Sequence, residues 1–240
     1  VEEAVGDGLV LLAFRLSDFG WVSEHWETLA ALRPAIPVPP AAPDALVTAT
    51  GTSAPILPAD WLAHAATQPD LYARLLGLPQ KLEAMEGLRG FDLADGALAG
   101  KARRAVLIPS AESRAPRIVE RHAPDSGVVW LAYDLAPDTR ADALLAHPLL
   151  PYAAVGADVP DVEETRLITA LPNGFLAFAR YGDDDTLASA PTAAPGRMAP
   201  AEAHSRLAPR GCLACHGDGL ALAGDQLRQR ILERKADLPA

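Results

Sequence analysis

Both cysteines of this chain lie three positions apart near one end of the sequence, and this placement limits the kind of fold that can be expected. Cys212 and Cys215 are the only cysteines among 240 residues. No disulfide framework is therefore expected, and none is required at this size. With 50% hydrophobic residues, the chain has ample length to bury a core in one large or two small domains.

The two cysteines belong to a Cys-Leu-Ala-Cys-His segment that ends at His216, and three interpretations compete for it. A zinc half-site needs a second pair of ligands at matching spacing, but the nearest other histidine, His204, precedes the motif and no pair of histidines follows it. A redox dithiol of the thioredoxin type needs a strand that leads into a helix opening at the first cysteine. The flanking Pro209 and Gly217 predict a loop instead.

The third interpretation, covalent attachment of a c-type haem, fits the motif best. Two thiols add across the haem vinyl groups, and the adjacent histidine becomes the proximal iron ligand. We therefore expect one covalent haem c, bound by Cys212 and Cys215, with His216 as the proximal ligand. Arginines near the haem would pair with its propionates, because guanidinium binds carboxylate in a bidentate fork. The candidates are Arg210, Arg206 and Arg121.

In this motif the chain resembles the c-type cytochromes. The resemblance implies a periplasmic or extracellular location, because haem is attached to such a motif outside the bacterial cytoplasm. The chain begins with Val rather than Met, so we expect that a signal peptide was removed or that the sequence is a fragment of a longer protein.

The charge and hydropathy of the chain narrow the classes of partner. A net charge of −10 at pH 7 argues against nucleic acid as a partner. An acidic surface can steer a basic redox partner protein, or it can serve only to keep the chain soluble. The most apolar stretch, residues 8–16, is too short to cross a bilayer, and no apolar run approaches about 18 residues, so no transmembrane segment is expected.

Hydrophobic periodicity divides the chain into three regions and predicts an α+β fold. Residues 1–103 are expected to form a mainly helical N-terminal region with a Pro-rich connector over 34–55. Residues 104–181 are expected to form an antiparallel β region of four strands. Residues 182–240 are expected to form a C-terminal haem-binding loop and helix.

Within the N-terminal region, residues 8–16 begin as a buried strand and residues 23–32 form a helix in this interpretation. Three further short helices are expected over 61–67, 71–76 and 79–88.

The β region is predicted from a hydrophobic period of two. Residues 117–122 and 128–134 flank an Ala-Pro-Asp-Ser-Gly loop, and residues 166–171 and 175–180 flank Pro-Asn-Gly. Both arrangements are typical of β-hairpins. A polar helix over 224–235 is expected to close the chain.

Several short segments resemble a second family. The succession SDFGW, ILPADWL, LYARLLGLP, RIVERH, HPLLP, LPNGFLAF and CLACH is similar to that of a family of uncharacterised secreted bacterial proteins, which pair an α+β domain with c-type haem. The resemblance covers roughly residues 10–216 and implies this domain layout, not an activity.

The sixth ligand of the haem iron decides the function. No Met or His follows His216. The usual order of the small cytochromes, in which a downstream methionine completes the coordination of the iron, therefore does not apply. The distal position must be filled from upstream or left open. The candidate distal ligands are His122, His147, Met198 and His204.

Two functions follow from these alternatives. A strong sixth ligand would make the chain a monohaem c-type cytochrome that transfers electrons, which is the function we expect. An open distal face would make it a haem enzyme or small-ligand binder with peroxidase-like or nitrogen-oxide chemistry, in which Arg121 and His122 would act. Neighbouring side chains on one strand point to opposite faces, which counts against that pair. A third alternative makes residues 1–180 an interaction module that the haem connects to a partner.

Overall fold

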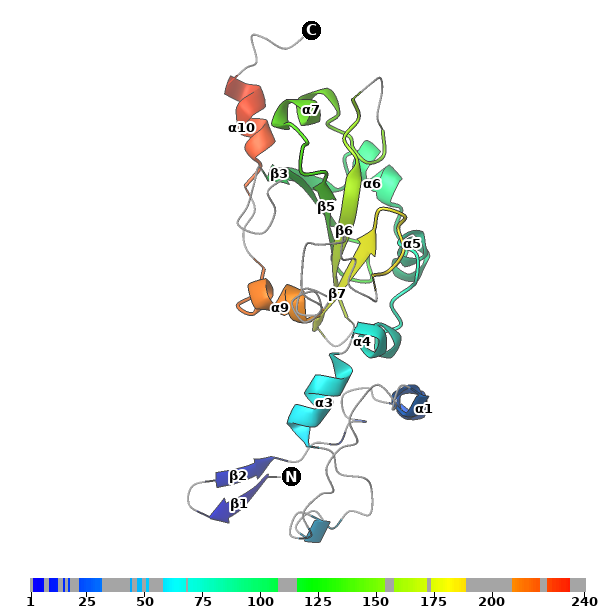
Figure 1. Cartoon of the computed structure of the whole chain (residues 1–240), viewed down its shortest axis with the longest axis vertical. Helices are drawn as coiled ribbons and strands as arrows, with labels where there is room; N and C mark the ends of the chain where they lie inside the picture. The colour runs from blue at the N-terminus through cyan, green and yellow to red at the C-terminus, as the bar shows by residue number, and fades with distance from the viewer. Residues whose placement is uncertain are drawn as a thin grey trace. The chain divides into compact units, whose positions relative to one another are not determined.

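The computed structural model describes residues 2–6, 9–12, 15, 17, 22–31, 44, 47–48, 51, 58–67, 69–107, 116–153, 158–171, 174–188, 209–220 and 224–233. The chain divides into two compact units, Val1–Gly77 and Leu78–Ala240 (Figure 1). The predicted domain boundaries after residues 103 and 181 stay predictions.

The first unit contains a β-hairpin and short helices. Strands β1 (Glu2–Gly6) and β2 (Leu9–Leu12) pair antiparallel. The helices with defined bounds among its described residues are α1 (Ser23–Ala31), α3 (Ala59–Ala66) and α4 (Pro69–Leu75). Burial of Ala65 and Leu71, which are 0% and 1% exposed, holds α3 against α4, because removing apolar surface from water is the main force that stabilises so small a pair.

The second unit is built on a five-stranded antiparallel sheet in which every strand pairs with its neighbour in sequence. Its strands are β3 (Arg103–Leu107), β4 (Arg117–His122), β5 (Val129–Leu135), β6 (Val162–Ala170) and β7 (Leu176–Gly182). Its helices are α5 (Glu83–Arg89), α6 (Leu93–Leu98), α7 (Ala141–Ala146), α9 (Arg210–His216) and α10 (Gln226–Glu233).

The two faces of this sheet differ in composition, because successive residues of a strand point to opposite sides. One face, here called the core face, is almost fully buried. Its residues include Ile118, Leu131, Tyr133, Leu167, Ala177 and Tyr181. The other, here called the mixed face, alternates apolar and charged residues and is mostly half-buried. Its residues include Val119, Trp130, Ala132, Ile168 and Phe178, with Arg117, Asp134, Glu164, Arg166 and Arg180.

Helices cover the two faces unequally. Gly96 of α6 lies against the imidazole of His122 on the core face, and the hydroxyl of Tyr181 donates to the carbonyl of Pro79, just before α5. Figure 1 shows α5 and α6 on one side of the sheet and α9 on the other.

The predicted fold class is wrong in two respects. The sheet has five strands rather than four, and the N-terminal part, which was expected to be helical, opens with a β-hairpin. The fifth strand is β3, which pairs with β4 across the connection 108–115. That connection carries no tight-turn signal, and β3 begins with two arginines, so neither its ends nor its polarity marked it as a strand.

Most individual elements lie where the sequence predicted them. The strand near residue 9, the helix from residue 23 and both predicted hairpins are confirmed, as is the closing helix. The haem motif, however, lies in helix α9 and not in a loop. The Pro-rich connector 34–55 falls almost entirely outside the described residues.

Candidate functional site

Helix α9 carries the whole Cys-x-x-Cys-His motif. Its first turn closes with a hydrogen bond from the Leu213 amide to the Pro209 carbonyl at 2.9 Å. Cys212 and His216 are four residues apart on this helix, so they lie on the same side of it, and both are half-buried. Cys215 directly precedes His216 on the last turn. The proline and glycines that suggested a loop lie at the start and just beyond the end of the helix, where they do not break it.

The imidazole of His216 is held in one tautomer by the backbone that follows it. Its Nδ1 lies 3.2 Å from the carbonyl oxygen of Gly219, and the Gly219 amide donates to the His216 carbonyl at 3.1 Å. A carbonyl only accepts, so Nδ1 carries the hydrogen and the lone pair of the neutral ring is on Nε2. Metal-binding histidines show the same arrangement, with one nitrogen donating to a carbonyl and the other left for the metal.

The turn behind His216 depends on glycine. Gly219 has φ +105°, a conformation that L residues with a side chain rarely adopt. Sequence inspection noted the glycines after the motif only as loop residues, and missed that one of them orients the histidine.

His216 lies against the mixed face of the sheet. Its ring stacks on Phe178 at a centroid separation of 6.0 Å and an interplanar angle of 26°, and Phe178 is only 4% exposed. The strand registers place Ile168 beside Phe178, Trp130 beside Ile168, and Arg121 beside Trp130. The motif therefore stands at one end of an apolar row that runs across three strands and ends at an arginine. Sequence analysis did not single out Phe178.

A network of ion pairs flanks this apolar row. Glu164 pairs with Arg180 and, at 2.8 Å, with Arg166. Asp134 pairs with Arg117 and, at 3.0 Å, with Arg166. Three guanidinium groups thus face two carboxylates, which leaves one excess positive charge within this network. Burial raises the pKa of Glu164, but the hydrogen bond and charge of Arg180, with the charge of Arg166, outweigh burial and hold it below its ordinary value.

His122 lies on the core face, opposite to the face that His216 contacts. It is 5% exposed and its Nε2 lies 3.1 Å from Glu120 Oε2. Its ring packs 5.3 Å from that of Phe91. Arg121, by contrast, is exposed on the mixed face, so the two neighbours lie on opposite sides of the sheet, as strand alternation predicts. The structure does not bring His122 and His216 together.

Glu120 organises a buried polar cluster around His122. It is 0% exposed, and its Oε1 lies 2.7 Å from Arg104 Nε in an ionic contact. Its Oε2 accepts a hydrogen bond from the Tyr152 hydroxyl at 2.8 Å, and Tyr133 and Tyr152 are hydrogen-bonded to each other. A buried carboxylate is tolerated only when paired and hydrogen-bonded in this way. The position of Glu120 two residues before His122, on the same strand face, was the available signal, and sequence analysis did not use it.

The other predicted site residues have separate surroundings. His147 is 5% exposed at the end of α7. The carbonyl of the neighbouring Pro148 accepts a hydrogen bond from Arg104 at 2.9 Å. Arg210 opens α9 and is half-buried. Met198, His204 and Arg206 lie outside the described residues.

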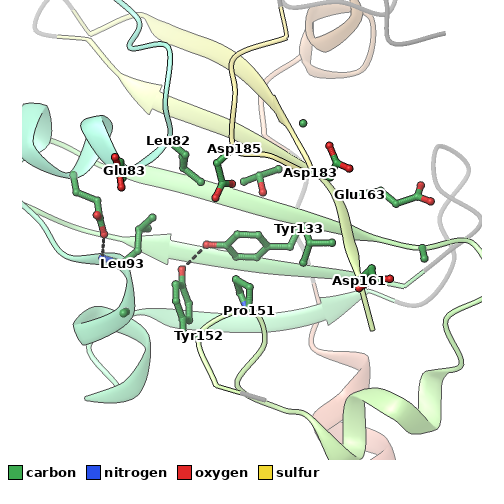
Figure 2. A pocket seen from close by; sticks show the side chains of 16 residues that line it. Leu82, Glu83, Leu93, Tyr133, Pro151, Tyr152, Asp161, Glu163, Asp183 and Asp185 are labelled. Carbon is green, nitrogen blue, oxygen red and sulfur yellow. Dashed lines mark hydrogen bonds between the residues drawn. The ribbon is translucent and has the colours of Figure 1, made fainter. Parts of the chain in front are cut away.

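A groove of about 840 Å³ lies at the edge of the core face, away from helix α9 (Figure 2). Tyr133 and Tyr152 lie in its floor, and Figure 2 shows their hydroxyls directed toward each other. Six carboxylates line it, from Glu83, Glu86, Asp161, Glu163, Asp183 and Asp185. No sequence motif marked this groove, because its residues come from five separate stretches of the chain.

Comparison of the chain with models of protein families, with curated proteins and with solved structures gives no match. Among the described residues, no group of three or more His, Cys, Asp or Glu side chains is arranged to hold a metal ion. In the same part of the chain, none of the helices has the length and apolar character needed to cross a membrane.

Proposed function

We propose that this chain is a monohaem c-type cytochrome of the periplasm or the extracellular space, and that it transfers electrons. The observation that carries the proposal is the state of His216. It ends a Cys-x-x-Cys-His helix, and the Gly219 carbonyl lies 3.2 Å from its Nδ1, which places the lone pair on Nε2, as in a histidine that binds iron through that nitrogen.

The residues around the motif fit a haem. Cys212 and His216 share one side of α9, so the thioether and the iron ligand approach the same ring. The porphyrin edge can pack against the apolar row of Phe178, Ile168 and Trp130. The excess positive charge of the adjoining ion-pair network can pair with the haem propionates. When bound, the haem supplies an iron that alternates between the ferric and ferrous states.

Electron transfer is favoured over catalysis at an open distal face. The catalytic alternative relied on Arg121 and His122 acting together, but one is on the mixed face and the other is in the Glu120 cluster of the core face. We therefore propose Met198 or His204 as the sixth ligand, and a basic redox protein as the partner of this acidic chain, whose net charge is −10.

The proposal is tested by producing the chain in bacteria with and without a cytochrome c maturation system. We expect a pink protein whose mass exceeds that of the polypeptide by one haem, and only when maturation is present. Cys212→Ala together with Cys215→Ala will abolish the covalent haem, whereas Asp218→Asn, an exposed change two residues past the motif, will leave it intact. Folded wild-type protein that leaves the maturation strain without haem would refute the proposal.

Spectra of the haem-loaded protein separate electron transfer from an open site. A sixth protein ligand predicts sharp low-spin bands after reduction that carbon monoxide does not change. A high-spin spectrum that shifts with carbon monoxide would instead refute the electron-transfer role. Met198→Ala and His204→Ala, compared in the same assay, identify which residue supplies the ligand.

A further inference from the structure

The groove on the core face has a strongly negative rim. Glu83, Asp161, Glu163, Asp183 and Asp185 are all exposed there. Among the described residues, the carboxylates of Glu83, Asp161, Glu163 and Asp183 form no hydrogen bond or ion pair. Like charges that share one concave surface repel one another and create a local potential that attracts cations.

The pKa of the Asp185 carboxyl group reflects this surrounding negative charge. Its pKa is raised by burial and by the charges of Asp184 and Glu83, although Lys81 acts in the opposite direction. The Lys81 ammonium itself is bonded to the carbonyl of Asp184 at 2.8 Å and to Thr186 at 2.7 Å. It is not among the residues that line the groove, so it leaves most of the negative rim uncompensated.

The floor of the groove provides buried polar and aromatic groups. Thr165 lines the groove and is only 2% exposed, and its hydroxyl has no hydrogen-bond partner among the described residues. This hydroxyl is not one of the fully buried atoms left without a partner, so it can be reached from the groove and can bond to a ligand there. Tyr133 and Tyr152 stay neutral, because burial first and the charge of Glu120 next raise the pKa of both phenols. Neutral aromatic faces attract ammonium groups.

The spacing of the carboxylates favours an organic cation over a metal ion. Where the chain is described, no three acidic or histidine side chains converge closely enough for a metal. The charges are instead spread around a groove of about 840 Å³, which is within the usual range for small-molecule sites of about 300–1,000 Å³. Separated negative charges match a ligand whose positive charges are separated too.

We propose that this groove binds a linear organic polycation with two or more ammonium groups, of the polyamine class. The rim carboxylates pair with the ammonium groups, the Thr165 hydroxyl accepts a hydrogen bond from one of them, and the half-buried ring of Tyr152 packs against the methylene chain. The site is on the opposite side of the sheet from His216, so it does not depend on the haem.

Isothermal titration calorimetry of the full chain with spermidine tests this proposal. We expect one site per chain, no binding of uncharged 1,6-hexanediol, and little competition from equimolar MgCl₂. Glu163→Gln combined with Asp183→Asn will weaken spermidine binding by about tenfold or more, because two rim carboxylates that pair with ammonium groups lose their charge. The control Asp125→Asn removes a charge in the β4–β5 hairpin, outside the groove, and will leave binding unchanged.

A second variant tests the floor without changing the charge. Thr165→Val keeps the shape of the side chain and removes its hydroxyl, and we expect spermidine affinity to fall by about tenfold while the thermal unfolding temperature does not decrease. Absence of spermidine binding at 1 mM would overturn the proposal. Equal weakening by Asp125→Asn, or full displacement by equimolar Mg²⁺, would also overturn it, because either result would mean non-specific attraction to an acidic surface.

Discussion

Replacing Glu120 by glutamine will destabilise the second unit by roughly 3–5 kcal/mol, the usual cost of breaking a buried ion pair by removing one partner. The carboxylate is 0% exposed and lies 2.7 Å from Arg104 Nε, whose own side chain is 16% exposed. At an effective dielectric constant of about 20, two unit charges at that separation attract by about 6 kcal/mol. Hydrogen bonds from Arg104 to the Pro148 and Leu150 carbonyls remain in the variant and limit the loss.

Urea unfolding followed by circular dichroism, with hydrogen exchange of the β4 and β5 amides, measures this change within the sheet. With a slope of about 2 kcal/mol per molar urea, the midpoint of the second unit will fall by about 1.5–2.5 M. Adding Arg104→Met to Glu120→Gln removes the stranded positive charge, and we expect it to restore most of the lost stability. A loss below about 1 kcal/mol for Glu120→Gln, or a double variant no more stable than the single one, would show that the pair is not what holds this cluster.

Three other changes test separate parts of the second unit. Gly96→Ala will destabilise it by roughly 1–3 kcal/mol, because a Cβ there would lie 2.8 Å from His122 Nδ1. In the matched helix substitution Gly87→Ala the new Cβ meets nothing within 4 Å, so urea unfolding will show a stabilisation of about 0.5–1 kcal/mol. Equal effects of the two substitutions would contradict the contact between Gly96 and His122. Glu164→Gln will destabilise the chain at pH 7. Because the folded pKa of Glu164 lies below its ordinary value of 4.5, the extra stability of the wild-type protein is present above pH 4.5 and is lost as the pH falls through the folded pKa. A stability difference between the two proteins that persists at pH 2 would contradict this. Gly219→Ala will lower the stability by about 1–2 kcal/mol, because φ is +105° at this position, and it will change the spectrum of the haem-loaded protein. An unchanged spectrum and an unchanged unfolding midpoint would show that Gly219 does not orient His216.

The parts of the fold that the sequence predicted are those with strong local signals. Both predicted hairpins have Gly- and Pro-containing turns between alternating strands, and local chemistry is enough to define them. Strand β3 has no such turn, since it reaches β4 through residues 108–115. The position of β3 depends on its pairing with β4 in the folded sheet, and no local sequence pattern encodes that pairing.

The motif of the candidate site could be recognised in the sequence, but the residues that surround it could not. The spacing of Cys212, Cys215 and His216 on one segment identified the proposed attachment site directly. The stacking of Phe178 on His216 depends on which face of the sheet helix α9 covers, and alternation alone says only that the faces differ. For the same reason the alternation rule separated Arg121 from His122, but it gave no means of deciding which of them faces His216.

The sheet registers also constrain how this protein can change over evolutionary time. The proposed haem face and the acidic groove use alternate residues of the same strands, so a substitution on one side leaves the other side's chemistry untouched. Inserting a single residue in β5 just before Tyr133 would turn that partner of Glu120 from the core face to the mixed face. The two surfaces can therefore diverge independently by point substitution. Strand length affects both surfaces at once, so we expect it to change more slowly than the residues on either face.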